Sequence, residues 1–185
     1  NLDIKKVKIY LSISNLTNPK LKISTKDPTL ILDDNKIELK TLDTSIDILS
    51  YFKDHFIIEN FEIRTKDNKI KDIISIVVSK EPSWFFWNML IKKGYASAYV
   101  ALKFDENGKI TNYKLDGEIK DAKAEYNEEY SFENINFDFS NQKNETLIKN
   151  LNFYYKKIRF LSEQINVTSA KKDETLVSGD IRNEK

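Results

Sequence analysis

The sequence predicts a β-rich α+β fold: an extended, curved, mainly antiparallel β-sheet, shaped like a groove or a taco, interrupted by two helices at about residues 70–93. Two observations support this class. Apolar and polar residues alternate over most of the chain, which is typical of antiparallel strands with one buried and one hydrated face. A sustained helical period occurs in one stretch, and strand-like sequence runs away from it on both sides.

The composition is that of a folded protein, and it excludes several classes of function. The chain has 185 residues, of which 40% are hydrophobic and 32% charged, so it is long enough to bury a core. The formal charge is +1 and only Arg64, Arg159 and Arg182 carry guanidinium groups, so no nucleic-acid partner is expected. Cysteine is absent, which excludes disulfides, thiolate metal ligands and a cysteine nucleophile.

Residues 1–66 form the first predicted segment, a series of short strands. Ile37 and Leu39 alternate with charged neighbours, which indicates a strand with one apolar face. One helical turn is expected over residues 49–54, followed by a strand over residues 56–65. Because the chain has only four glycines and three prolines, Asn, Asp and Lys must make most of its turns.

Residues 67–94 form the second segment, a helical pair. The first helix is indicated by aliphatic residues that recur with helical spacing: Ile70, Ile73, Ile74, Val77 and Val78. Asp67 or Asn68 is expected to cap its start, and Pro82 interrupts it.

A second helix is predicted over residues 83–93, with Gly94 closing it in the left-handed conformation. It is apolar nearly all round, and its candidate contact residues are Trp84, Phe85, Trp87 and Leu90. At roughly ten residues it falls short of the about 20 needed to cross a bilayer. Burial between the sheet and the first helix is the favoured expectation. The alternatives are a plug in an apolar groove and docking on a membrane surface.

Residues 95–185 form the third segment, an antiparallel meander that is expected to be repeat-like and to continue beyond the C-terminus. Residues 105–108 predict a hairpin turn in which Gly108 has positive φ, and a change of phase indicates a bulge or turn at Lys156 and Lys157. The pattern aliphatic, any residue, Gly, acid, Ile, base occurs at 115–120 and again at 177–182, which suggests a repeated β unit.

No catalytic, cofactor or metal-binding constellation can be nominated, so the protein is not expected to be an enzyme. The one histidine, His55, has no second histidine to complete a metal site, and a surface or packing role is favoured for it. Glycine-rich phosphate loops and a GxSxG motif are absent from the sequence.

The distinctive feature is instead a surplus of apolar strand positions. These side chains either close into a core or line an open groove that accommodates acyl chains, and periodicity alone does not separate the two. The candidate groove residues are Ala98, Val100, Leu102, Phe104, Leu115, Ile119, Ile135, Phe137 and Phe139.

Several stretches carry a resemblance to a known family. They are residues 18–23, 37–42, 45–48, 61–63, 93–94, 104–110, 115–122 and 132–135. Their pattern of strands and turns resembles the AsmA-like superfamily of bacterial envelope proteins, nearest to its YhdP and TamB branches.

The resemblance implies a large periplasmic protein anchored in the inner membrane by an N-terminal helix that this sequence lacks. It also implies a long β-groove with an apolar interior that moves phospholipid towards the outer membrane. The expected partners are therefore phospholipid acyl chains, other envelope proteins and, through the missing anchor, the inner membrane. The alternative is a non-enzymatic β-rich scaffold or envelope-assembly module that binds protein partners through exposed strand edges.

Overall fold

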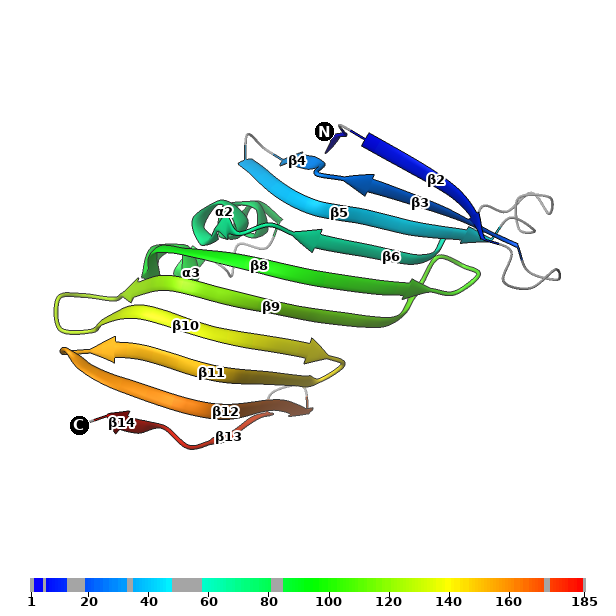
Figure 1. Cartoon of the computed structure of the whole chain (residues 1–185). Helices are drawn as coiled ribbons and strands as arrows, with labels where there is room; N and C mark the ends of the chain where they lie inside the picture. The colour runs from blue at the N-terminus through cyan, green and yellow to red at the C-terminus, as the bar shows by residue number, and fades with distance from the viewer. Residues whose placement is uncertain are drawn as a thin grey trace.

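The computed structural model describes residues 2–4, 6–12, 19–32, 35–47, 58–80, 85–171 and 174–184. These residues form one open, uncurled, mainly antiparallel sheet of 14 strands, with two helices lying against it (Figure 1). The predicted β-rich α+β class, with an extended, mainly antiparallel sheet interrupted by two helices, is confirmed. The expected curling of the sheet into a groove or taco is not seen, because the described strands form an open, uncurled sheet. The residues of the turn expected at 49–54, together with His55 and Trp84, lie outside the described part of the chain.

In the described part of the chain, seven strands precede the helices and seven follow them. The first set is β1 (Leu2–Asp3), β2 (Lys6–Ser12), β3 (Lys20–Lys26), β4 (Thr29–Leu32), β5 (Asn35–Asp47), β6 (Ile58–Thr65) and β7 (Asn68–Lys69). The second set is β8 (Ile91–Phe104), β9 (Ile110–Glu125), β10 (Ser131–Gln142), β11 (Glu145–Tyr155), β12 (Ile158–Lys171), β13 (Glu174–Gly179) and β14 (Arg182–Glu184). Strand β6 pairs with β8, so both sets belong to the same sheet.

The strands after the helices run as a simple antiparallel meander from β8 to β13. The expected hairpin at residues 105–108 is present: the Gly108 N–H donates to the Asp105 carbonyl at 3.0 Å, and Gly108 has φ of 74°. Lys156 and Lys157 form the tight turn between β11 and β12, with φ of 49° and 66°. Two consecutive positive φ angles are typical of a type I′ hairpin, which accounts for the change of phase seen in the sequence.

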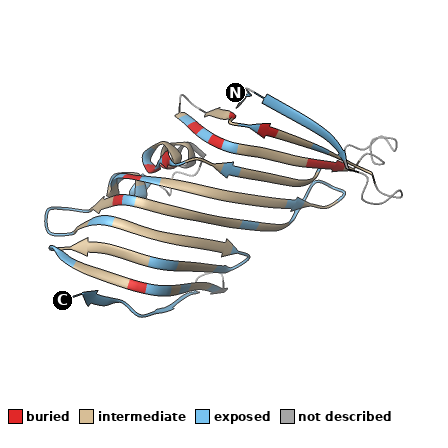
Figure 2. Ribbon diagram, in the orientation of Figure 1, coloured by how far each residue is buried: buried red, intermediate tan, exposed pale blue. Residues whose placement is uncertain are grey.

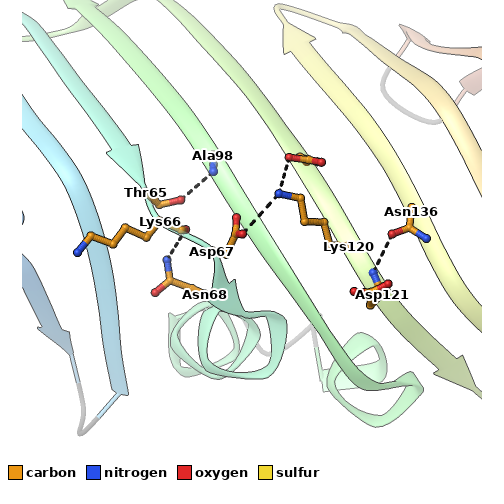
Figure 3. A network of polar contacts seen from close by, with 9 residues as sticks. Thr65, Lys66, Asp67, Asn68, Ala98, Lys120, Asp121 and Asn136 are labelled. Carbon is orange, nitrogen blue, oxygen red and sulfur yellow. Dashed lines mark hydrogen bonds and ion pairs between the residues drawn. The ribbon is translucent and has the colours of Figure 1, made fainter.

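Helix α2 (Ile70–Lys80) lies where the sequence predicts it, but Asn68 has a different role from the expected cap. The Asn68 side chain accepts a hydrogen bond from the Glu38 N–H at 2.7 Å and donates to the Glu38 and Lys66 carbonyls at 3.0 and 2.8 Å. Figure 3 shows the bond to Lys66. Because Asn68 is only 6% exposed, its amide acts as a substitute peptide group that ties β7 to β5.

The prediction for the second helix is wrong in its extent and in its favoured burial. Helix α3 (Phe85–Leu90) ends at Leu90 and not at the expected Lys93, and none of its residues is buried. The chain becomes strand at Ile91 because this residue pairs with Ala124 of β9. Gly94 lies inside β8 with φ of 131°, where a Cβ atom would lie 2.6 Å from Ala122 Cα. Gly94 therefore permits close strand packing and does not cap a helix.

Few of the described side chains are buried (Figure 2). Most lie in β5 and beneath α2, and Ser162 in β12 lies apart from them. Ile70 and Ile74 of α2 pack against Ala122 of β9, with Ala96, Ile119 and Ile135 partly buried around them. The helices contact mainly β5, β7 and β8. They therefore cover one end of one face of the sheet.

Bulges keep the apolar side chains of the meander on one side. The pairing register shifts at Asp121 in β9, Asn134 in β10 and Asn150 in β11, which have φ angles of 49°, 49° and 55°. Each extra residue changes the phase of the alternation. Phe132 and Ile135, three residues apart, consequently lie on the same face of β10.

Asparagine side chains link these bulges to one another. Asn136 accepts from the Asp121 N–H at 2.9 Å and donates to the Asn134 carbonyl at 2.7 Å; Figure 3 shows the first of these bonds. The Asn136 amide also donates to Asn152 at 3.3 Å, and Asn152 donates to the Asn150 carbonyl at 3.3 Å. The ladder fixes the three bulges across neighbouring strands.

We predict that Asn134→Val lowers the free energy of unfolding by about 1–2 kcal/mol, because a β-branched residue is strained at positive φ. Asn134→Gly should change it by less than about 0.5 kcal/mol, since glycine adopts this conformation freely. Chemical denaturation of the two variants measures the difference. Equal stabilities would contradict a requirement for positive φ at this bulge.

Candidate functional site

One face of the sheet carries a continuous apolar band. A row of directly opposed residues crosses β2, β3, β5, β6 and β8 to β13 without a charged side chain: Val7, Thr25, Leu42, Ile63, Val100, Leu115, Asn141, Thr146, Val167 and Val177. Opposed residues of an antiparallel pair project from the same side of the sheet. This side is the apolar face.

The row one residue away projects from the opposite side and is almost wholly polar. Its members are Lys6, Lys26, Thr41, Arg64, Tyr99, Asp116, Ser140, Leu147, Asn166 and Ser178. This side is the polar face. The contrast between the two rows shows that the sheet separates apolar from polar side chains across ten strands.

The structure brings the predicted groove residues together on the apolar face. Val100 lies opposite Leu115, and Leu102 occupies the next position of the same face on β8. Phe104, at the end of β8, follows the same alternation and pairs with Ile110. The others lie beside them in β8, β9 and β10: Ala98, Ile119, Ile135, Phe137 and Phe139. All nine are half-buried.

The face is larger than the predicted set. Phe132 stacks on Tyr155 with ring centroids 5.2 Å apart, and Phe153 stacks on Phe160 at 5.3 Å. Ile148 extends the face by pairing with Phe139. The alternation in the sequence indicated that each of these strands has an apolar side. It did not indicate that the sides coincide, because this depends on the register and the bulges.

Glycine lets two of these strands pack closely at the centre of the face. Gly117 lies opposite Ala98 and Phe139, and a Cβ atom there would overlap the Phe139 ring and lie 2.6 Å from the Ser97 carbonyl oxygen. Gly179, the matching residue of the second sequence copy, lies opposite Ile165, and a Cβ atom would lie 2.7 Å from the Gln164 carbonyl oxygen. Both glycines therefore allow an aromatic or aliphatic neighbour to lie over the strand.

The helices cover part of the apolar face. Ile119 and Ile135 pack against the α2 cluster, whereas Val100, Leu115 and Phe139 are not part of it. Of the helix candidates, Phe85 and Trp87 are exposed and Leu90 is half-buried. Among the described residues, the open part of the face thus lies beyond the helices, over β8 to β12.

The polar face is stabilised by ion pairs and hydrogen bonds. The Tyr99 hydroxyl donates to Glu62 at 2.9 Å, and the Arg64 guanidinium lies 4.4 Å from the centre of the Tyr99 ring. Partial burial and the Glu62 carboxylate raise the pKa of Tyr99. Asp116 accepts from Ser140 at 2.7 Å and pairs with Lys114 at 2.6 Å.

The described residues contain no cluster of three or more His, Cys, Asp or Glu side chains that could hold a metal ion. In the same part of the chain, no helix is both long and apolar enough to cross a membrane.

No family model, curated protein or solved structure matches this chain. The class that the structure itself defines is a single-layer, open antiparallel sheet with one apolar and one polar face.

We predict that Asp116→Asn weakens the acid sensitivity of the fold. Partial burial acts to raise the pKa of Asp116, but the Lys114 and Ser140 hydrogen bonds outweigh it and hold the pKa below the usual value. A lowered pKa adds stability above pH about 4, and this stability is lost as the pH falls through the folded-state value.

The variant should lose less than about 1 kcal/mol at pH 7, because the pair is partly exposed. It should also show a shallower fall in stability below pH about 4. Denaturation midpoints between about pH 2 and pH 7 measure this. If stability falls equally steeply with pH in the variant and the wild type, the lowered pKa of Asp116 is contradicted.

Proposed function

We propose that this chain is a segment of an AsmA-like periplasmic lipid conduit and that its apolar face shelters phospholipid acyl chains between the inner and outer membranes. The observation that carries the proposal is the apolar row that crosses ten strands from β2 to β13. A closed sandwich would cover such a face with a second layer. Here the described helices cover only one end of it.

The chemistry of such a conduit is passive. An acyl chain laid on the apolar face is removed from water, which contributes about 0.8 kcal/mol per buried methylene. The headgroup stays hydrated at the edge of the face. No nucleophile, base or metal takes part, so binding and sliding need only a continuous apolar path.

The alternative function is that of a β-rich scaffold that binds a protein partner by strand addition. The observation that favours it is the exposure of β13, in which every residue is exposed. Crosslinking of a partner strand to β13, in protein that carries no lipid, would support this alternative over the conduit.

The conduit is tested by native mass spectrometry and lipid extraction on the chain secreted into a bacterial periplasm. Ile148 and Leu147 are adjacent and half-buried, and they project from the apolar and polar faces respectively. We expect the wild type and Leu147→Asp to retain phospholipid. Ile148→Asp should lose about 100-fold in lipid occupancy, because a charge among acyl chains costs roughly 3 kcal/mol.

Val100→Asp and Phe137→Asp provide independent tests on β8 and β10. All variants are first checked for a cooperative thermal transition. A lipid-free wild type, or equal lipid retention by Ile148→Asp and Leu147→Asp, would refute the conduit. Unfolding by both Val100→Asp and Phe137→Asp would identify these positions as closed core and refute it as well.

A further inference from the structure

Two strands at opposite edges of the sheet each have an unpaired side. Among the described residues, β2 pairs only with β3, and β13 pairs only with β12 (Figure 1). The outer N–H and C=O groups of an edge strand are available to another strand. Ile9 and Leu11 of β2 are 65% and 59% exposed, and Leu176 and Val177 of β13 are 65% and 62% exposed. Edge strands that are this exposed and apolar are sites of association.

The two edges match in direction and in face. Every neighbouring pair in the row of ten strands from Val7 to Val177 is antiparallel, and ten is an even number, so β2 and β13 run in opposite directions. If β13 of one molecule lies beside β2 of the next, with both apolar faces on the same side, the new pair is antiparallel like all the others. Such an addition therefore continues the sheet in its own pattern and extends the apolar row.

The charges of the two edges are complementary. Strand β2 contains Lys6 and Lys8 and no acidic residue. Strand β13 contains Glu174 and no basic residue, and Asp180 follows it directly. None of these four side chains forms an ion pair with another described residue. Each edge therefore carries charges that the other edge can neutralise.

We propose that β2 of one molecule pairs with β13 of a second copy, so that the chain assembles head to tail. In the register that continues the row without a step, Val7 lies opposite Val177, and both side chains project from the apolar face. A contact between two different edges leaves one edge open at each end of the pair. It is therefore repeated along a growing series of molecules and is not closed in a dimer.

The same register brings opposite charges together. Lys8 lies diagonal to Glu174, and Lys6 lies diagonal to Asp180; such neighbours are about 7–8 Å apart, within the reach of a lysine side chain. Two β2 strands aligned on the valine of the row would instead place Lys6 opposite Lys8. Two β13 strands aligned in the same way would place Glu174 opposite Asp180. Because like charges on neighbouring strands are unfavourable, the two symmetric pairings are disfavoured relative to the pairing of β2 with β13.

Assembly through the edges is separate from lipid carriage on the apolar face. Ile148 lies in β11, which is paired on both sides, so Ile148→Asp should assemble like the wild type even where it loses lipid. A failure of assembly and a failure of lipid retention can thus be told apart. In the proposed conduit, each added copy would lengthen the apolar face by one further row of strands.

Disulfide trapping identifies the paired strands, because the chain has no cysteine of its own. The single variants Val7→Cys and Val177→Cys are purified and mixed under mild oxidation. Opposed residues have Cβ atoms about 4.5–5.5 Å apart, so a small movement lets a disulfide form. We expect a disulfide-linked dimer of the two variants, and none when Val7→Cys is mixed with Tyr126→Cys, a control position that is 70% exposed in the β9–β10 turn. Dimers formed by either edge variant alone would show that a strand pairs with its own copy and would overturn the proposal.

Exchange of charges between the edges tests the complementarity. In sedimentation velocity we expect wild-type species that grow with protein concentration. Lys6→Glu with Lys8→Glu should lower the association constant by about 30-fold, since two attractive pairs become repulsive. Glu174→Lys with Asp180→Lys should lower it by a similar factor. A mixture of the two double variants should regain association, because each edge of one variant then faces an edge of opposite charge on the other.

Lys156→Glu with Lys157→Glu in the β11–β12 turn is the matched control, and it should assemble like the wild type. A wild type that stays monomeric at every concentration would overturn the proposal. So would growth that stops at a dimer, or a mixture of the charge variants that associates no better than its components. If circular dichroism shows that a charge variant fails to fold, the disulfide trap decides the matter.

Discussion

The structure depends on keeping its apolar side chains in phase from strand to strand. In a β-strand one extra residue turns every later side chain to the other face, so a long meander is separated into two faces only if such shifts are placed together. Asp121, Asn134 and Asn150 place them in three neighbouring strands, and the Asn136 and Asn152 amides hold them there. Without this alignment, Phe132 and Ile135 would lie on opposite faces.

A single-layered sheet whose apolar and polar side chains lie on opposite faces has an apolar face that must be covered. Helix α2 covers one end through Ile70 and Ile74, which pack against Ala122. Most side chains in the rest of the sheet are half-buried, and it is their neighbours within the sheet that cover them. No second layer of described residues lies over them. Acyl chains would serve as that cover in the proposed conduit. This links the packing of the sheet directly to its proposed use.

The two faces are maintained by different interactions. On the polar face, ion pairs such as Lys114 with Asp116 and Lys120 with Glu118 run between alternate positions of β9, and each contributes little because it is partly exposed. On the apolar face, aromatic rings stack and side chains pack closely against the glycines. In the proposed conduit, an apolar face backed by a hydrated one would suit an amphipathic ligand.

The sequence by itself determined the class of fold, the position of α2, the hairpin at residues 105–108 and the apolar side of each strand, because these follow from local periodicity and turn chemistry. The sequence could not predict where the second helix ends, because Ile91 joins a strand by pairing with Ala124, 33 residues away. The exposure of Phe85 and Trp87 was decided by packing. Only the tertiary structure could align Val7 with Val177, because register is set between strands and not within them.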